Sequence, residues 1–290
     1  MLIYFSSSEL SQEIQKSVDV VQQQQKSDQH DKVLDWLSPT DFPAQQFDLI
    51  SRRQEGTGLW FLNSAEYTNW LQGSIKTLFC PGIPGAGKTM IAAITIDHLL
   101  TTIRCKDVGV AYLYCNYKMR ADQTTTGLLA AILKQLVHGR PSAAEPVMRL
   151  FNQHTTKQTR PSLEEIFDSL QSVLSDYTST YIVVDALDEC TDKEGTCSQL
   201  LHRLRSLQPN ADVHLMATSR FIPEIEKKFE LMPRLEIRAS DEDIERFVRG
   251  QMHRLAGCVQ RNETLQDLVQ QKLVKAVDGM LVYCDNSKLH

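Results

Sequence analysis

The chain has 290 residues and a formal net charge of −5, with 42% hydrophobic and 23% charged residues. At roughly 100–200 residues per domain, this length suits one large α/β domain with a smaller appendage, and the composition is ordinary for a globular protein. The acidic balance argues against a nucleic-acid-binding protein, which needs a basic excess to neutralise phosphates.

An N-terminal helix is predicted over residues 9–27, where apolar side chains recur at helical spacing in a Gln-rich background: Leu10, Ile14, Val18 and Val21. Such a narrow apolar stripe packs either on its own chain or on a partner helix. A second, short helix is predicted over residues 32–37. It ends before Pro39, because a proline disfavours the helical conformation in the residue that precedes it. Residues 42–58 read as an irregular, polar loop.

Ser64 can cap a further helix that holds Tyr67 and Trp70. This helix lies directly before the glycine-rich stretch at residues 82–89, which is described next. In folds that bind a nucleotide through such a stretch, this position often borders the base. One possibility is therefore that adenine contacts the segment from Arg53 to Trp60. The alternative is that Trp60 and Trp70 pack in the core. Core packing is favoured, because aromatic side chains contribute most through burial.

The stretch from Thr77 to Ala92 reads as a short apolar strand, a glycine-rich turn and the start of a helix. It satisfies the pattern G-x-x-x-x-G-K-[ST] of the phosphate-binding loop at Gly82, Gly87, Lys88 and Thr89. The glycines let the backbone wrap closely round an anion, and the amides at the helix start point at it with the helix dipole behind them. A chance match is disfavoured because the flanking strand and helix are present.

We expect a nucleoside triphosphate to bind along this loop, through Gly82, Ile83, Pro84, Gly85, Ala86, Gly87, Lys88 and Thr89. The Lys88 ammonium is expected to reach the β- and γ-phosphates. The Thr89 hydroxyl is expected to ligate Mg²⁺. The loop therefore predicts a nucleotide cofactor together with a divalent cation.

Helices and strands alternate after the loop. The patterns predict a buried strand over residues 108–114 and helices over residues 90–102, 128–137 and 143–152. Pro141 ends the second of these helices. Ser162 and Glu165 form a capping box that opens another helix.

The run Tyr181-Ile182-Val183-Val184 predicts a buried strand that ends in Asp185, with Asp188 and Glu189 just beyond it. Asp185 is expected to hold Mg²⁺, through water or through Thr89. Asp188 or Glu189 is expected to polarise the attacking water. As an alternative, these acids cap or solubilise a loop. That interpretation fits Asp188 or Glu189 taken singly, but it poorly explains an apolar strand that runs straight into three carboxylates.

A further strand is predicted over residues 213–220, with Thr218, Ser219 and Arg220 at its end. Ligands of open α/β sheets lie at the carboxyl ends of the strands. Arg220 is therefore either a sensor of the γ-phosphate or a surface residue after a strand, and both interpretations stay open. The remaining predictions are a short strand over residues 235–238 and helices over residues 240–248 and 265–277.

Three motifs occur together in this chain: GIPGAGKT at 82–89, IVVDALDEC at 182–190 and ATSR at 217–220. With LDWLSPTDF at 34–42 and RRQEGTGLWFL at 52–62, they resemble the NACHT domain of signal-transducing STAND ATPases. The similarity is greatest to the large filamentous-fungal NACHT proteins and to the nephrocystin-type N-terminal NTPase module. It covers roughly residues 30–280.

The resemblance implies an α/β P-loop NTPase fold with a mainly parallel sheet flanked by helices, plus N-terminal helices and a C-terminal helical segment. It implies ATP (or ADP) rather than GTP, with Mg²⁺. It also implies a switch that associates with itself, or with a related NACHT protein, when the triphosphate is bound. It assigns Lys88 and Thr89 to phosphate and Mg²⁺ binding, and Asp185 to Mg²⁺ binding. It assigns Asp188 or Glu189 to hydrolysis and Arg220 to sensing of the γ-phosphate.

We expect three regions: an N-terminal helical and linker region (1–62), the NACHT P-loop NTPase domain (63–239) and the start of a C-terminal helical domain (240–290). Members of that family usually carry an effector domain before the NTPase domain, and a winged-helix region and repeats after it. A chain of 290 residues leaves no room for these parts. The last proline is Pro233, so the proline-bearing sensor motif of the following domain is missing. We therefore expect a truncated copy or the product of a mispredicted gene model.

The predicted function is a STAND-type switch with slow ATP hydrolysis. The alternative is a nucleotide-binding interaction module, or a relic, with negligible hydrolysis. A small-molecule kinase is disfavoured because the acids after the strand at 181–185 suit water activation. A Ras-like GTPase is disfavoured because the sequence contains no N-K-x-D base reader and Asp185 is followed by Ala-Leu-Asp.

The seven cysteines are scattered and form no C-x-x-C pair, which argues against a disulfide framework or a zinc site and suits a reducing compartment. No apolar run approaches the roughly 18 residues that a membrane helix needs. The N-terminus lacks the basic region of a signal peptide. We expect a cytoplasmic protein with neither a membrane nor a nucleic-acid partner.

Overall fold

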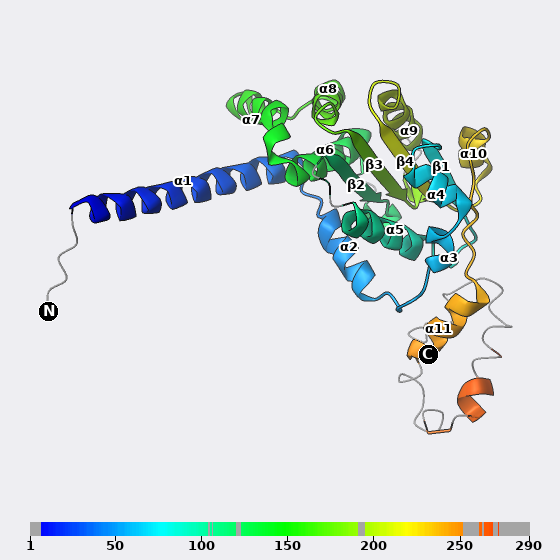
Figure 1. Cartoon of the computed structure of the whole chain (residues 1–290). Coiled ribbons are helices and arrows are strands. Elements are labelled where there is room, and N and C mark those ends of the chain that lie inside the picture. The colour runs from blue at the N-terminus through cyan, green and yellow to red at the C-terminus, as the bar shows by residue number, and fades with distance from the viewer. Residues whose placement is uncertain are drawn as a thin grey trace, which may run out of the picture.

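The computed structural model describes residues 7–103, 105, 107–119, 123–190, 195–251, 261–262, 264–268 and 272. Among these residues, parallel strands form a sheet in the order β1-β4-β3-β2 (Figure 1), with the bounds β1 Thr77–Pro81, β2 Val108–Tyr114, β3 Ser179–Asp185 and β4 Val213–Ser219. The strands coincide with the apolar runs that predicted them. The predicted α/β fold with a parallel sheet flanked by helices is confirmed.

β4 lies between β1 and β3, with Phe79 opposite Ala217 and Ile182 opposite Leu215. Because the strands are parallel, their carboxyl ends meet at one edge of the sheet. The glycine-rich loop after β1, the acids after β3 and Arg220 after β4 therefore lie beside one another. This strand order brings together residues that are far apart in the sequence.

The short strand predicted over residues 235–238 is wrong. The segment runs beside β1, and its backbone makes an isolated parallel bridge between Phe79 and Arg234. Leu235 and Ile237 donate their N–H groups to the carbonyls of Phe79 and Pro81 at 3.0 and 2.7 Å. The ladder ends there because Pro81 has no N–H to donate in return.

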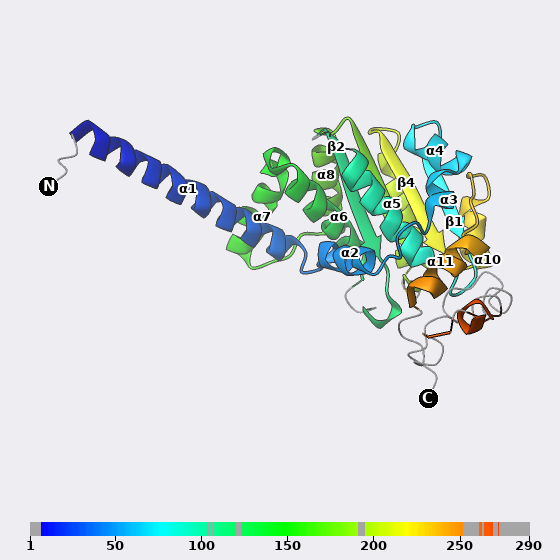
Figure 2. The ribbon, with the colours of Figure 1, turned by 60° about the horizontal axis from the view of Figure 1, so that its bottom comes forward.

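Helices cover both faces of the sheet (Figures 1 and 2). On one face lie α2 and α5, with bounds Phe42–Ser51 and Lys88–Thr102. On the other lie α6 Thr125–Gly139, α8 Leu163–Leu174 and α9 Thr196–Leu207, while α7 Glu145–Lys157 packs on α8. The predicted capping box is confirmed, since Ser162 N donates to Glu165 Oε2 at 2.8 Å and Glu165 N to Ser162 Oγ at 3.3 Å.

The remaining elements are short or lie near the ends of the described chain. They are α1 Ser7–Leu37, α3 Leu59–Leu62, α4 Ala65–Leu71, α10 Pro223–Glu226, α11 Asp241–Gln251 and the 3₁₀ turns η1 Tyr117–Met119, η2 Pro141–Ala143, η3 Leu187–Glu189 and η4 Lys227–Phe229. Of the helix predicted over residues 265–277, residues 264–268 are helical, and most of the rest lies outside the described residues. Among the helices that the structure describes, none is both long and apolar enough to cross a bilayer.

The two predicted N-terminal helices are one continuous helix, α1. The sequence between residues 27 and 32 holds neither glycine nor proline, so nothing breaks the helix there. Val33, Leu34 and Leu37 are buried at its end, where α1 contacts α6 and α7. The preceding part projects away from the body (Figures 1 and 2), and Val18 and Val21 are exposed.

The irregular loop predicted over residues 42–58 is wrong for its first half, which forms α2. Asp41 caps this helix by accepting a hydrogen bond from Ala44 N at 3.0 Å. Its buried positions include Gln46, whose side-chain amide donates to Ala93 O at 2.9 Å and accepts from the Tyr114 hydroxyl. Because a polar glutamine occupies a position on the buried face, the sequence of this helix lacks the regular spacing of apolar residues that predicts a helix.

The predicted Ser64 cap is confirmed, because its hydroxyl accepts a hydrogen bond from Tyr67 N at 3.2 Å. On the same helix, α4, Trp70 is fully buried and donates from Nε1 to Leu215 O at 3.1 Å. Core packing is therefore confirmed for Trp70.

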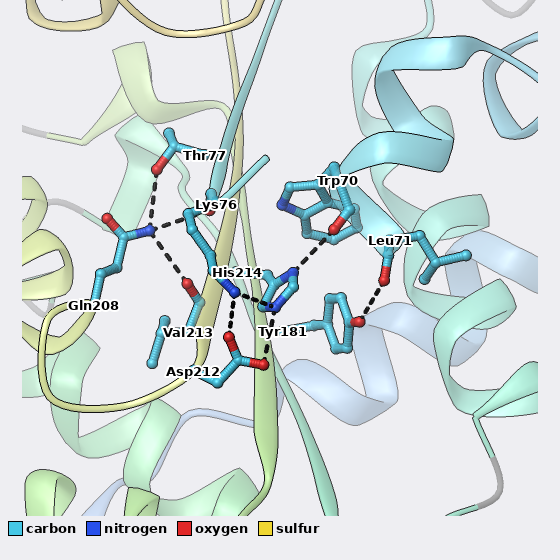
Figure 3. A network of polar contacts seen from close by, with 9 residues as sticks. All are labelled: Trp70, Leu71, Lys76, Thr77, Tyr181, Gln208, Asp212, Val213 and His214. Carbon is cyan, nitrogen blue, oxygen red and sulfur yellow. Dashed lines mark hydrogen bonds and ion pairs between the residues drawn. The ribbon is translucent and has the colours of Figure 1, made fainter. Parts of the chain in front are cut away.

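A polar network ties α4 to the sheet at the edge where the strands begin (Figure 3). His214 on β4 is buried, and its Nδ1 lies 2.9 Å from Trp70 O. Because a carbonyl only accepts hydrogen bonds, Nδ1 carries the proton. His214 Nε2 faces Asp212 and Lys76, which form an ion pair with each other. This network lies at the opposite edge of the sheet from the glycine-rich loop.

Candidate functional site

A cavity of about 510 Å³ opens at the carboxyl edge of the sheet. Five segments line it: residues 52–60, which run into α3; the glycine-rich loop with the start of α5; residues 185–189 at and after the end of β3; Arg220 after β4; and residues 239–247, which run into α11. Of the residues predicted to bind the nucleotide, the cavity is lined by Pro84, Gly85, Ala86, Gly87, Lys88 and Thr89. Gly82 and Ile83 lie beside it and contact Lys88 through their carbonyls.

The glycine-rich loop has the backbone that its sequence predicts. Gly85 and Gly87 have φ angles of 76° and 90°, a left-handed region that glycine enters without steric cost. A Cβ at Gly82 would lie 2.4 Å from Ile237 O, so only glycine fits there. Gly87 is also the residue that caps α5, and it leaves the first amides of that helix without a capping side chain. These amides suit an anion.

Lys88 lies across the loop. Its Nζ donates hydrogen bonds to Gly82 O at 2.9 Å and to Ile83 O at 2.8 Å. Partial burial lowers the pKa of this ammonium, and the carboxylates of Asp188 and Asp185 oppose the shift. The side chain therefore stands between the loop backbone and the acids after β3.

Asp185 ends β3 and is 2% exposed. Its Oδ1 accepts a hydrogen bond from Thr218 Oγ1 at 2.6 Å. Burial raises the pKa of this carboxyl, while hydrogen bonds from Thr218 and Thr89 act in the opposite direction. The carboxylate and the Thr89 hydroxyl are adjacent oxygen donors, the type of ligand that Mg²⁺ prefers. The residues present thus fit a magnesium site.

The chain turns sharply after Asp185. Ala186 adopts a left-handed conformation with φ 53°, which is rare and strained for a residue other than glycine. Its N–H donates to Thr218 Oγ1 at 2.9 Å, so Thr218 fixes both Asp185 and the turn. The strained turn directs the following residues, η3, into the cavity, which Asp188 and Glu189 both line.

Asp188 and Arg220 form an ion pair inside the cavity. Arg220 donates from its backbone N to Asp188 Oδ1 at 2.9 Å and from Nε to Oδ2 at 2.5 Å. The side chain of Asp188 is 2% exposed and that of Arg220 is 48% exposed. Asp188 raises the pKa of the Arg220 guanidinium, which therefore stays charged. The Glu189 carboxylate, which also lines the cavity, accepts a hydrogen bond from Tyr117 N at 3.3 Å.

The motifs did not reveal the part of the cavity formed by α11. Asp243 on this helix is buried and accepts a hydrogen bond from Gly58 N at 2.9 Å. Gly58 and Trp60 belong to the segment, residues 53–60, in which the sequence allows an adenine contact, and both line the cavity. A signal was available in the sequence, because Asp243 lies four residues before Phe247 and therefore on the apolar face of its helix.

Comparison with known proteins gives one family and several relatives. The family described as nephrocystin 3, N-terminal, matches residues 56–220. The vegetative incompatibility protein HET-E-1 of Podospora anserina is 27% identical over 180 residues, which cover 59% of this chain and 13% of that protein. The matched part of this chain thus corresponds to a small fraction of the length of its relative.

Solved structures that are similar to this chain share little sequence with it. The Walker-type ATPase PABY2304 of Pyrococcus abyssi has 12% identity and a TM-score of 0.52, covering 81% of this chain and 69% of that one. DnaA from Aquifex aeolicus, solved with AMPPCP bound, has 14% identity and a TM-score of 0.41, covering 77% and 59%. Because the sequence identity is only 12%, the similarity to the Pyrococcus structure shows a shared fold and nothing about a shared activity.

Proposed function

The chain belongs to the nephrocystin 3 N-terminal family, and from this premise we propose that it binds ATP with Mg²⁺ and acts as a nucleotide-dependent switch that hydrolyses ATP slowly. The observation that carries the proposal is the composition of one cavity. It is lined by the phosphate-binding loop at the start of α5, by Asp185 at the end of β3 and by Arg220 after β4. An anion-binding helix start, a buried carboxylate and a cation are the groups that a magnesium–triphosphate complex requires.

The roles in binding follow from the groups that each residue presents. The amides of residues 85–89 cradle the phosphates, and Lys88 exchanges its two carbonyl contacts for phosphate oxygens. Thr89 and Asp185 hold Mg²⁺, which neutralises phosphate charge when bound. Arg220 is a cation on a half-exposed side chain, suited to detect the γ-phosphate.

The two acids after β3 divide the remaining roles. Arg220 occupies both carboxylate oxygens of Asp188, so this acid holds the sensor in place. Within the described part of the chain, Glu189 accepts a hydrogen bond from one backbone amide, which leaves most of its acceptor capacity for a water molecule. We therefore assign water polarisation to Glu189 and positioning of Arg220 to Asp188.

The ion pair also favours a second candidate function, a nucleotide-binding interaction module with negligible hydrolysis. While Asp188 holds Arg220, the guanidinium is committed to an acid. In a protein in which this pair persists after ATP binds, the Arg220 guanidinium does not stabilise the transferred phosphoryl group. The two candidates differ only in whether the γ-phosphate displaces Asp188 from Arg220.

We further propose that triphosphate binding promotes association with a second copy of the chain or with a related NACHT protein in the cytosol. The support is the family membership and the 27% identity to HET-E-1. Light scattering of the purified chain with ATP and with ADP tests this part. A larger mass with ATP than with ADP supports the switch, and equal masses contradict it.

Phosphate release under saturating Mg-ATP distinguishes the two candidates. The switch predicts slow turnover, well below the median of about 10 s⁻¹ for enzymes. Binding without phosphate release supports the interaction module. A folded chain that binds no nucleotide contradicts both.

A further inference from the structure

Beside the phosphate loop and the charged groups, apolar side chains from three helices form part of the cavity wall. These are Trp60 on α3, Ile91 and Ile94 on α5, and Phe247 on α11, and the polar residues Arg52, Gln54 and Thr57 complete the lining. Gly58 packs directly on α5, since a Cβ there would lie 2.6 Å from Ile94 Cδ1. Flat apolar walls of this kind suit the faces of an aromatic base.

A buried carboxylate, that of Asp243, lies among these apolar side chains. Asp243 is 6% exposed, and its Oδ2 accepts the hydrogen bond from Gly58 N. Arg246 donates to Gly56 O at 2.8 Å, and its Nη1 stays 3.9 Å from Asp243 Oδ1. Because a carboxylate offers about four acceptor sites, Asp243 keeps capacity for a donor that enters the cavity.

Burial makes such a donor favourable. It raises the pKa of Asp243, and the hydrogen bond from Gly58 N–H offsets only part of this shift. A buried carboxylate that is incompletely compensated gains from each added hydrogen bond. The group is therefore prepared to accept a hydrogen bond from a ligand.

We infer that Asp243 is a specificity residue of the nucleotide site, which accepts a hydrogen bond from the exocyclic amino group of adenine. The inference rests on the proposed function, that is, on triphosphate binding in this cavity. Adenine carries an amino donor at C6, where guanine carries a carbonyl oxygen. A carboxylate binds the first and repels the second.

The substitution Asp243→Asn tests this role without removing the tie to the loop. The Gly58 N–H still requires an oxygen, so the amide nitrogen of the asparagine takes the place of the other carboxylate oxygen. A donor then replaces an acceptor toward the base. The preference at C6 is thereby reversed, from an amino group toward a carbonyl.

The measurement is the Kd of the full chain for ATP, GTP and purine riboside 5′-triphosphate, which lacks the amino group, by titration calorimetry. We expect the wild-type chain to bind ATP about tenfold tighter than purine riboside triphosphate. We expect Asp243→Asn to lower the Kd ratio of GTP to ATP by about tenfold or more. Glu242→Gln is the matched control, because this neighbour on α11 is exposed, and its ratio should equal that of the wild type.

Two outcomes overturn the inference while leaving the proposed function intact. One is a wild-type chain that binds ATP and purine riboside triphosphate equally, a result that needs no variant. The other is an Asp243→Asn chain in which all three affinities fall by the same factor, which indicates a purely structural tie to Gly58. A folded wild-type chain that binds none of the three overturns the proposed function itself.

Discussion

Arg220 binds both carboxylate oxygens of Asp188, one through its backbone amide and one through its guanidinium. The pair joins the turn after β3 to the end of β4. It joins the residue proposed to sense the γ-phosphate to one of the two acids predicted to act on water. The same cavity also contains Glu189, whose carboxylate contacts the Tyr117 amide. These contacts distinguish Asp188 from Glu189, two acids to which the sequence assigns the same possible role.

Glu189→Gln should retain ATP binding and lose hydrolysis, because the amide keeps the shape of the side chain but is too weak a base to polarise water. Phosphate release should fall by about 10²-fold or more, with the Kd for ATP changed less than about threefold. Single-turnover phosphate release and calorimetry measure the two quantities. If Asp188→Asn loses hydrolysis and Glu189→Gln retains it, then Asp188, and not Glu189, is the acid that polarises water.

Asp188→Asn should act on stability as well. It removes the charge that pairs with Arg220, whose side chain is half exposed, so solvent limits the loss to about 1 kcal/mol. Thermal unfolding of the nucleotide-free chain measures this effect. An unchanged melting temperature would show that the ion pair contributes nothing to the folded state.

Arg220→Gln should reduce the ability of the site to distinguish ATP from ADP. The wild-type guanidinium gains a charge-assisted contact only when a γ-phosphate is present, and the variant lacks that contact. The Kd ratio of ADP to ATP should therefore fall by about tenfold. A ratio equal to that of the wild type would assign Arg220 to the surface of the protein, outside the sensing mechanism.

Asp185→Asn should stabilise the chain in the absence of Mg²⁺ and nucleotide, and abolish Mg²⁺-dependent hydrolysis. Burial raises the pKa of this carboxyl in the folded state, so the folded chain binds its proton more tightly than the unfolded chain does. Wild-type stability therefore falls as the pH rises from the unfolded pKa, about 3.9, toward the folded pKa. The variant avoids this loss, and we expect a gain of about 1 kcal/mol at neutral pH.

Denaturant titrations of wild type and Asp185→Asn between pH 4 and 8 check this sign. The difference in unfolding free energy should grow with pH and then level off. A variant less stable than the wild type at neutral pH would show that the charged carboxylate is favourable in the empty site.

Asp212→Asn should weaken the network at the other edge of the sheet (Figure 3). Burial alone would raise the pKa of Asp212, but hydrogen bonds and charge from Lys76 and His214 lower it overall. Its stabilisation is therefore present above the unfolded pKa and lost as the pH falls through the folded pKa. The side chain is 42% exposed, so we expect less than about 1 kcal/mol at neutral pH.

Thermal unfolding at pH 7 and below pH 4 measures this difference. It should shrink in acid, while the Kd for ATP stays that of the wild type, because the network is remote from the nucleotide cavity. A change in ATP affinity would contradict this separation of the two edges.

The sequence predicted the strands and the phosphate loop because their physical requirements are local. Buried parallel strands read as continuous apolar runs, and the loop needs glycines at fixed positions, such as Gly87 with its φ of 90°. The sequence did not predict α2, where Gln46 occupies a buried position through hydrogen bonds to Ala93 and Tyr114. That compensation comes from elements far away in the chain.

The other differences also depend on distant partners. Residues 235–238 have the pattern of a strand, but the ladder needs an N–H that Pro81 on β1 lacks. Asp243 enters the cavity through a contact with Gly58, 185 positions earlier in the sequence. Local patterns report which residues are apolar or charged, and only the assembled sheet shows which of them meet.

The binding of Mg-ATP to the purified chain, with Lys88→Ala beside it, tests the central claim most directly. The Lys88 ammonium donates hydrogen bonds to two loop carbonyls, those of Gly82 and Ile83, so its removal should leave the fold intact. Loss of a charge-assisted phosphate contact should weaken binding by at least about tenfold. Lys227→Ala is the control, because this lysine is exposed. We predict that calorimetry detects ATP binding in the wild type and in Lys227→Ala but not in Lys88→Ala. Equal ATP affinity in all three chains would contradict the assignment of the site.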